Sequence, residues 1–201
     1  MRVIAGSLKG RRLKTPTWEG LRPTSEKLRE TLFNILASRV VDARVLDAFA
    51  GTGALGLEAL SRGARAATFV DDDRRALALI RANVQHCGVE NRCVIIPTKA
   101  ARALDAWPMG ASSARFDIVF LDPPYAPAGR GSIDAILRTA GLVLARRGVV
   151  VLEHARRTAV PVTAGGLTRT RRVESGDSAL TFYEIRQPTE PGSPANLQGA
   201  S

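Results

Sequence analysis

The 201-residue chain is 45% apolar and 24% charged, a composition that excludes a disordered or fibrous protein and predicts one globular domain. Its 29 lysines and arginines outnumber the 19 acidic residues, so the net charge of +10 favours a nucleic-acid partner, with arginine-biased composition as the alternative explanation. No apolar run reaches the ~20 residues of a membrane helix, and two cysteines, Cys87 and Cys93, are too few for a disulfide framework. We therefore expect a cytoplasmic protein with reduced, buried thiols and no membrane partner.

The first 20 residues are expected to form a small, basic β-hairpin. Strand-like residues 3–5 precede a turn at 7–14 that is rich in lysine and arginine, and Pro16 follows. The basic side chains are Lys9, Arg11, Arg12 and Lys14. Their grouping in one turn favours contact with nucleic-acid phosphates, and a solvated basic face is the alternative.

Residues 21–186 carry the pattern of a doubly wound α/β domain. Pro23 and a hydroxyl residue precede Leu28, which begins an apolar stripe of helical period, so an amphipathic, N-capped helix is expected. From residue 44 onward, short apolar runs alternate with stretches of helical period. The runs predict strands at 44–46, 67–70, 94–96, 117–121 and 149–152, and the stretches predict helices around 55–60, 77–84 and 133–137. This alternation is typical of a mostly parallel sheet.

The C-terminal part differs, because two strand-like segments, 168–174 and 179–185, are joined by a turn at Gly176 with no helix between them. We expect an antiparallel strand to close that edge of the sheet. Two stretches rich in small residues, 107–115 and 126–131, are expected to be loops, and the second could act as a lid. Residues 187–201 lack periodicity, which predicts a disordered tail.

A glycine-rich turn follows the first strand of the α/β pattern. Gly51, Gly53 and Gly56 form G-x-G-x-x-G, and Asp71 ends the next predicted strand. The glycines allow a tight turn beside a ligand, and Asp71 can accept hydrogen bonds from ribose hydroxyls, which fits a dinucleotide; a turn without any ligand is the alternative. Asp47, four residues before Gly51, would repel a pyrophosphate but suits an amine and a sulfonium. The turn therefore favours S-adenosylmethionine over NAD, unless Asp47 merely braces the loop.

The second candidate motif, D-P-P-Y at residues 122–125, ends a strongly apolar strand. Its two prolines stiffen a turn at the carboxyl edge of the sheet, where open parallel sheets bind ligands. Asp122 and the carbonyl of Pro123 can accept the two N–H bonds of an exocyclic base amine and aim its lone pair at a methyl sulfonium, while Tyr125 stacks on the base. A proline turn with a structural aspartate is the alternative.

These two motifs resemble those of methyltransferases that modify exocyclic nitrogens of nucleic-acid bases. Residues 2–6, 10–13, 21–24, 29–34 and 53–63 more narrowly resemble the RsmD family, bacterial enzymes that methylate the exocyclic N2 amine of a guanine in small-subunit ribosomal RNA. The resemblance extends to about Ile185. It implies a Rossmann-like class I methyltransferase fold, S-adenosylmethionine as cofactor, no metal, and ribosomal RNA in the small subunit or an assembly intermediate as partner of a monomer.

The resemblance also implies roles for particular residues. The cofactor pocket would contain Asp47, Phe49, Gly51, Gly53, Asp71, Asp72, Lys99 and Ala100. The catalytic loop would be Asp122, Pro123, Pro124 and Tyr125, and RNA contacts would come from Lys9, Arg11, Arg12, Lys14, Arg22 and Thr24. The sequence departs from the family pattern in two places: Asp72 replaces an apolar residue that often packs on adenine, and Lys99 and Ala100 stand where an Asp or Asn commonly holds the adenine amine.

These expectations divide the chain into three parts and leave several alternative functions open. Residues 1–20 would be the basic hairpin, 21–186 the methyltransferase domain and 187–201 the tail. The rivals are an amino methyltransferase acting on another RNA or on DNA, a non-catalytic RNA-binding module with the same fold, and a nicotinamide-dependent oxidoreductase that uses the same glycine turn.

Overall fold

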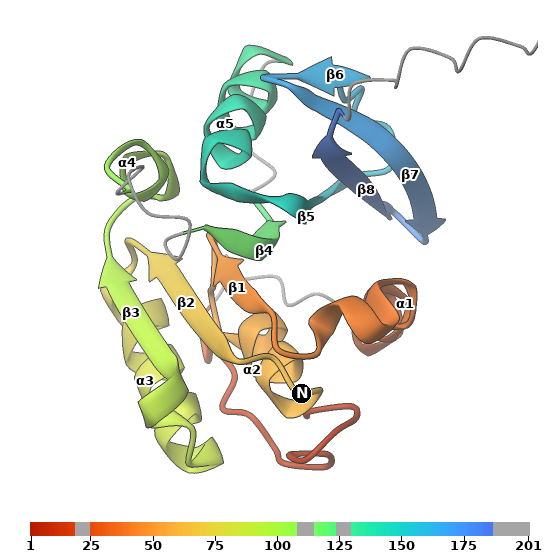
Figure 1. Cartoon of the computed structure of the whole chain (residues 1–201). Coiled ribbons are helices and arrows are strands. Elements are labelled where there is room, and N and C mark those ends of the chain that lie inside the picture. Colours follow the sequence, from red (N-terminus) through yellow and green to blue (C-terminus); the bar gives the residue numbers. More distant parts are fainter. Residues whose placement is uncertain (19–24, 108–114, 124–129, 187–201) are drawn as a thin grey trace, which may run out of the picture.

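The computed structural model describes residues 1–18, 25–107, 115–123 and 130–186, and within these residues the strands form one mixed sheet (Figure 1). Its order is β3-β2-β1-β4-β5-β8-β7-β6. The strands are β1 (Arg44–Asp47), β2 (Ala66–Asp71), β3 (Cys93–Pro97), β4 (Phe116–Leu121), β5 (Leu144–Ala155), β6 (Thr163–Ala164), β7 (Leu167–Ser175) and β8 (Ser178–Ile185). Strands β1 to β5 pair in parallel and β8, β7 and β6 in antiparallel fashion, which confirms the predicted fold class.

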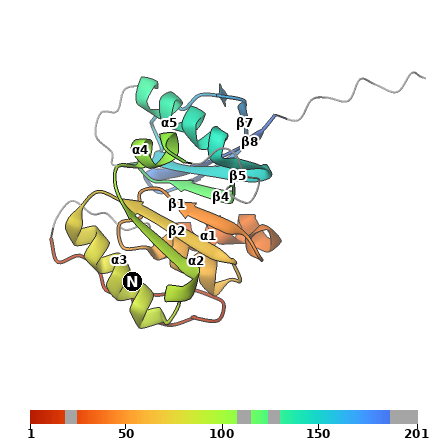
Figure 2. The ribbon, with the colours of Figure 1, turned by 60° about the vertical axis from the view of Figure 1, so that its left-hand side comes forward.

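Helices cover both faces of the sheet, with α1, α2 and α3 on one side and α4 and α5 on the other (Figure 2). Their bounds are α1 (Glu26–Leu36), α2 (Ala54–Ser61), α3 (Arg74–Cys87), α4 (Ala100–Asp105) and α5 (Arg130–Val143), with 3₁₀ turns η1 (Ala37–Val40) and η2 (Glu90–Arg92). Across the described ranges, none of these helices has the length and hydropathy to cross a bilayer.

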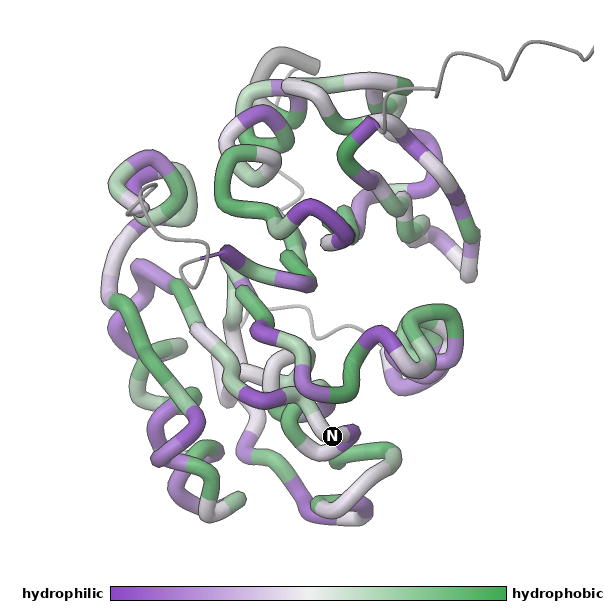
Figure 3. The backbone as a smooth tube through the Cα atoms, in the orientation of Figure 1, coloured by the Kyte–Doolittle hydropathy of each residue, from purple (hydrophilic) through white to green (hydrophobic). Residues whose placement is uncertain are grey.

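Strand β4 illustrates why these sequences form a buried sheet. Its side chains alternate between the two cores: Ile118 and Phe120 pack under α1, α2 and α3, whereas Val119 and Leu121 pack under α4 and α5. A strand buried on both faces carries an apolar run, here residues 118–121 between Asp117 and Asp122, and Figure 3 shows green segments in the strands of the sheet. Because side chains alternate between the two faces, the core that contains the neighbouring residues of a central strand shows which face a given residue points to.

Helix ends agree with the expected capping chemistry. The Ser25 hydroxyl accepts a hydrogen bond from the Leu28 amide at 3.1 Å, which confirms the predicted N-cap of α1. Gly88, in the left-handed conformation with φ of 67°, ends α3.

The N-terminal segment (residues 1–18) folds back on itself, but the only bridge between strand-like residues in this segment joins Arg2 to Arg12. Within the segment, the Val3 amide donates to the Arg11 carbonyl at 3.0 Å, Gly10 to Val3 at 2.9 Å and Leu13 to Met1 at 3.1 Å. Other amide groups bond to α2: Glu58 accepts from Ile4 at 2.7 Å and from Ala5 at 3.0 Å, and the Ser61 hydroxyl accepts from Leu8 at 2.9 Å. The pairing of the segment with itself is short and irregular, because the amides of residues 4, 5 and 8 have their partners in α2.

This segment is also part of the core. Val3, Leu8 and Leu13 are buried among residues of α1, α2 and α3. Gly6 has a φ of 84°, and a Cβ there would lie 1.9 Å from the Ser61 carbonyl oxygen, so only glycine allows this close approach to α2.

Three expectations need correction. Of the loop expected at 126–131, Arg130 and Gly131 belong instead to α5, and residues 126–129 lie outside the described residues. Helix α4, with only six residues, was not expected, because such a short helix has too few turns to show a period. Of the two cysteines, Cys87 is buried as expected, but Cys93 on edge strand β3 is half-buried. Of the loop expected at 107–115, residues 108–114 lie outside the described residues, as does the tail at 187–201.

Candidate active site

Carboxylates from three strands meet at the carboxyl edge of the parallel sheet. Asp47 ends β1, Asp71 ends β2 and Asp122 directly follows β4. Strand β1 lies between β2 and β4, which is the point where the chain switches from one side of the sheet order to the other. Open α/β sheets bind ligands in the crevice at such a switch point.

The glycine turn between β1 and α2 depends on backbone conformations that favour glycine. Gly51 and Gly53 have φ angles of 55° and 78°, and Gly53 caps the N-terminus of α2. A Cβ on Gly56 would lie 2.3 Å from Cε1 of Phe69 in β2, so glycine permits α2 to pack directly on the sheet. The turn therefore presents backbone rather than side chains to the crevice.

Asp71 joins the turn to the start of α3. Its Oδ2 accepts a hydrogen bond from the Gly51 amide at 2.8 Å and its Oδ1 accepts from the Asp73 amide at 2.9 Å. Each carboxylate oxygen has a second lone pair, so Asp71 can still accept hydroxyl hydrogens from a ribose. Asp72 is exposed beside it at the same edge.

Asp47 is a buried carboxyl group, with 2% of its surface exposed. Burial raises its pKa to about 7, a hydrogen bond of 3.1 Å from the Gly56 amide opposes the rise, and the negative charge of Asp71 adds to it. A cationic ligand would stabilise the ionised form of such a group, whereas a pyrophosphate would be repelled. The carboxyl groups of Asp47 and Asp71, together with the backbone of the glycine turn, thus fit an amino-acid ligand that bears positive charge.

Asp122 and Pro123, which follow β4, are half-buried. Burial, the nearby Glu153 and then Asp47 raise the pKa of Asp122 well above its ordinary value. Asp47 is opposite Phe120 in the pairing of β1 with β4, and Asp122 comes two residues after Phe120, so the structure brings Asp47 and Asp122 together at this edge. Pro124 and Tyr125 lie outside the described residues.

The residues expected near adenine are distributed around the same edge. Lys99 is the N-cap of α4 and Ala100 its first residue, directly after β3, which neighbours β2. Phe49, in the turn after β1, is partly buried against the core under α4 and α5.

The basic N-terminal residues differ in their distance from this edge. The Lys14 amide bonds to Asn83, which also bonds to the Thr52 carbonyl of the glycine turn, whereas Arg11 lies farther away. Lys9, Arg11, Arg12 and Lys14 are exposed, but the Arg11 guanidinium donates a hydrogen bond of 2.7 Å to the His86 carbonyl, in the last turn of α3. Helix α3 starts at the carboxyl edge and its 14 residues span about 20 Å, so Arg11 lies near the opposite end. Arg22 and Thr24 lie outside the described residues.

Asn83, to which no sequence motif pointed, connects the N-terminal segment to the glycine turn. Its side chain is fully buried; it accepts from the Lys14 amide at 2.7 Å and donates to the carbonyls of Lys14 at 3.1 Å and Thr52 at 2.9 Å. A lone asparagine on a predicted helix carries no sequence signal for this role.

Glu153 is a further acid near this edge that belongs to neither of the two motifs. It is 7% exposed and lies in β5, beside the end of β4. A signal was present, because Glu153 follows the apolar run 149–152 as Asp122 follows the run 116–121.

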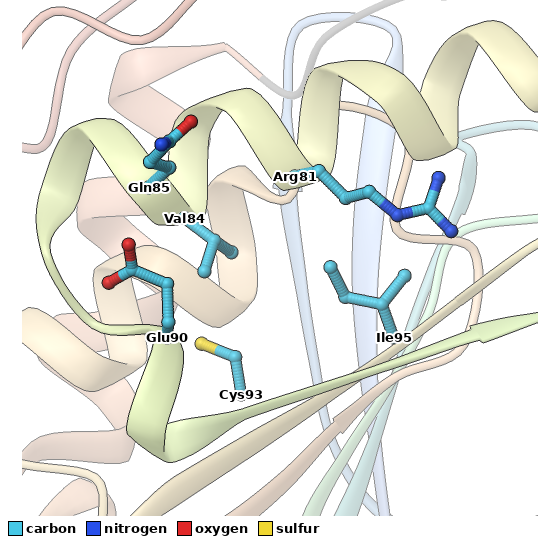
Figure 4. Close-up of a pocket in the computed structure, with 6 residues that line it drawn as sticks. All are labelled: Arg81, Val84, Gln85, Glu90, Cys93 and Ile95. Carbon is cyan, nitrogen blue, oxygen red and sulfur yellow. The ribbon is translucent and has the colours of Figure 1, made fainter.

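A separate hollow of about 420 Å³ lies between α3 and edge strand β3, lined by Arg81, Val84, Gln85, Glu90, Cys93 and Ile95 (Figure 4). Its lining comes from the middle and end of α3 and from β3, away from the carboxylates at the ends of β1 and β4. It is therefore not part of the candidate active site.

Comparisons with known proteins agree with this geometry. Residues 1–184 match the family model described as "Conserved hypothetical protein 95". Over 187 residues the chain is 35% identical to "Ribosomal RNA small subunit methyltransferase D" of Escherichia coli strain K12, covering 92% of this chain and 89% of the relative. The chain belongs to the RsmD family.

Two further matches support the RsmD assignment along nearly the whole chain. "Putative rRNA methyltransferase YlbH" of Bacillus subtilis is 36% identical over 186 residues, which are 92% of this chain and 100% of the relative. The solved structure "Putative methyltransferase yhhF" from Escherichia coli superposes with a TM-score of 0.77 at 33% identity, covering 92% of this chain and 99% of that one. The fold is therefore that of the S-adenosylmethionine-dependent methyltransferases.

Proposed function

We propose that this protein transfers a methyl group from S-adenosylmethionine to the exocyclic N2 amine of a guanine in small-subunit ribosomal RNA. The observation that carries the proposal is the placement of Asp47 and Asp122 after neighbouring parallel strands, so that a cation-binding carboxylate and an amine-binding carboxylate face one crevice. Membership of the RsmD family and the names of the relatives supply the substrate class.

The side chains divide the work between two ligands. Asp47 would hold the amino-acid end of S-adenosylmethionine, the backbone of Gly51 and Gly53 would lie against it, and Asp71 would accept the ribose hydroxyls. When bound, this cofactor supplies an electrophilic methyl group on a sulfonium. Phe49, Asp72, Lys99 and Ala100 would border the adenine, at the ends of β1, β2 and β3.

Asp122 and the Pro123 carbonyl would bind the target amine. An exocyclic amine is a weak nucleophile, because its lone pair is delocalised into the base. Two acceptors that hold its N–H bonds favour a tetrahedral nitrogen and fix the direction of the lone pair, so orientation supplies most of the rate enhancement. Tyr125, with Pro124 in the same loop, would stack on the base.

The wider context is part of the same proposal. A monomer would act in the cytoplasm on ribosomal RNA within the small subunit or an assembly intermediate, without a metal. Residues 1–20 would contact RNA phosphates through Lys9, Arg11, Arg12 and Lys14, residues 21–186 would be the catalytic domain, with Arg22 and Thr24 near the target base, and 187–201 a tail.

Labelling of the product tests the proposal directly. The protein is incubated with methyl-labelled S-adenosylmethionine and small subunits or their RNA from a strain that lacks it, and the labelled nucleoside is identified and mapped. We expect label in N2-methylguanosine at one position. Label in another nucleoside would reject the guanine assignment, and cofactor-independent RNA binding with no label would favour the non-catalytic module.

The RNA-contact role predicts a change in salt dependence. In the double variant Lys9→Gln/Arg12→Gln, the slope of log affinity for RNA against log salt should flatten by roughly 0.7–0.9 for each lost phosphate contact. Arg146→Gln removes one exposed charge at the amino-terminal part of β5 and serves as the control. An unchanged slope in the double variant would place the RNA away from the N-terminal segment.

A further inference from the structure

The N-terminal segment runs along α3 towards the crevice edge. Three contacts mark its path in order: Arg11 with the His86 carbonyl at 2.7 Å, the Lys14 amide with Asn83 at 2.7 Å, and the Trp18 ring with Arg75. Residues 11–18 can span about 23 Å when extended, and α3 rises about 17 Å between residues 75 and 86, so the segment is long enough for this path. Trp18 therefore lies at the end of α3 that faces the crevice edge.

Trp18 lies close to Asp71 at the rim of the crevice. Arg75 is the second residue of α3, and its backbone amide and guanidinium both donate to Asp73, the N-cap of that helix. The Asp73 amide donates in turn to Asp71, which ends β2. Only β1 separates β2 from β4, so the end of β2 is about 10 Å from the strand end that precedes Asp122. Trp18 is therefore placed to meet a nucleotide beside the target base, on the β2 side of the crevice.

The Trp18 ring is supported by its neighbours but only half-buried. The guanidinium carbon of Arg75 lies 4.8 Å from the ring centroid, and an ion pair of 2.9 Å with Asp73 fixes that guanidinium. Trp18 belongs to neither of the two cores formed by the described residues. A flat aromatic surface that is held in place and not needed by the core can bind a ring at little cost in side-chain entropy.

Exposed charged residues surround this ring. Lys14 precedes it by four residues, and Arg74 and Arg75 are exposed at the start of α3. Two acids, Asp72 and Asp73, lie in the same stretch, and the second is paired with Arg75. Aromatic rings between cations are typical of sites for single-stranded nucleic acid, because phosphates meet the cations and bases stack on the rings.

We propose that Trp18, supported by Arg75, stacks on an unpaired RNA base that flanks the target guanine. This inference rests on the proposed function, because it names a further contact of the same substrate. The target base must leave its stack to bring its amine to Asp122, and its neighbour then loses a stacking partner. The indole ring of Trp18 replaces that partner. Trp18 is thus a positioning residue, which acts on RNA affinity and KM rather than on the chemical step.

Tryptophan fluorescence observes this contact without any change at Trp18. The chain has two tryptophans, so Trp107→Phe leaves Trp18 as the only one. Trp107 packs on Phe116 with ring centroids 4.7 Å apart, and phenylalanine keeps an aromatic ring at that place. Small-subunit ribosomal RNA should quench the emission of Trp18, with saturation at the dissociation constant measured by filter binding. S-adenosylhomocysteine alone should leave the emission nearly unchanged.

An abasic scan identifies the stacked base. Nucleotides on either side of the mapped guanosine are replaced by abasic ones, one at a time, in an RNA fragment. At the stacking position, the lost base should weaken wild-type affinity roughly 5- to 30-fold, and Trp18→Leu should weaken affinity for intact RNA by a similar factor. The two losses should not add, because each removes the same contact.

Kinetics and two further variants separate stacking from a general structural effect. In Trp18→Leu, KM for RNA should rise with kcat nearly unchanged, and Trp18→Phe should recover part of the affinity because it keeps a ring. Leu142→Ala, which removes an exposed apolar side chain near the end of α5, is the matched control and should change neither quantity.

The outcomes separate this proposal from the proposed function. Unchanged Trp18 emission at saturating RNA would overturn the stacking role, and this result needs no substitution at Trp18. Quenching by S-adenosylhomocysteine alone would assign the ring to the adenine of the cofactor, and additive losses at every scanned position would assign it a structural role; either result would also overturn the proposal. Absence of methylation by the wild type would instead overturn the proposed function, whereas quenching by RNA can be measured without turnover.

Discussion

Asp122→Ala is expected to lower kcat for methyl transfer by about 10²–10³-fold, the usual cost of removing one oriented hydrogen-bonding group from an active site. The dissociation constant for S-adenosylmethionine should change only a few-fold, because Asp47 and Asp71, on neighbouring strands, and Gly51, in the turn after β1, would hold the cofactor. Single-turnover methylation and calorimetric titration measure the two quantities.

Asp122→Asn provides the informative comparison. Its amide oxygen can still accept one N–H bond from the base amine, so its rate should lie between those of the wild type and the alanine variant. Asp134→Ala, on α5 and paired with Arg138, is a control for removal of an acid outside the crevice. Full activity of Asp122→Ala would contradict the catalytic assignment, and loss of cofactor affinity in parallel with rate would indicate a structural role.

Asp47→Asn is expected to stabilise the fold and weaken cofactor binding. The pKa of Asp47 is raised from 3.8 to about 7, so the folded protein retains a proton that the unfolded chain releases above pH 4. The contribution of Asp47 to the free energy of unfolding is therefore fully present below pH 4 and is lost as pH rises from about 4 to 7. The loss is up to about 4 kcal/mol if the whole pKa shift is expressed. The asparagine variant lacks this loss.

Urea unfolding at pH 4 and pH 8 tests whether Asp47→Asn stabilises the fold and whether the effect depends on pH as expected. The variant should exceed the wild type in free energy of unfolding at pH 8, and the difference should shrink towards pH 4. Its affinity for S-adenosylmethionine should fall roughly 10- to 100-fold, consistent with loss of a hydrogen bond to a charged group. Wild-type affinity should rise with pH through about 7 and that of the variant should not; a variant less stable at pH 8 with unchanged affinity would contradict both expectations.

The nicotinamide alternative accounts for fewer of these features. It uses the glycine turn and Asp71, but it leaves a buried acid at Asp47 beside a pyrophosphate and gives Asp122 no substrate. Family membership and the superposition on a solved relative also point to methyl transfer. A thermal-shift comparison of S-adenosylmethionine with NAD separates the two directly.

Local sequence patterns determined the α/β alternation, the glycine turn, the N-cap at Ser25 and the antiparallel edge formed by β7 and β8. Each of these depends on residues close together in the chain, so hydrophobic period and turn chemistry suffice to predict it. Asp47, Asp71 and Asp122 could be found as single acids at strand ends for the same reason. The resemblance to RsmD sequences then joined them into one site.

Only the tertiary structure decided how distant parts combine. Glu58 bonds to amides 53 and 54 residues away, and Asn83 joins Lys14 to Thr52, so the N-terminal segment is fixed to α2 and α3 as well as being paired briefly with itself. Glu153 reaches the crevice because β5 pairs with β4, a choice of neighbour that strand sequences do not encode locally. Strand order is set by how all the apolar faces are buried at once, so the position of Glu153 beside Asp122 depends on the tertiary structure.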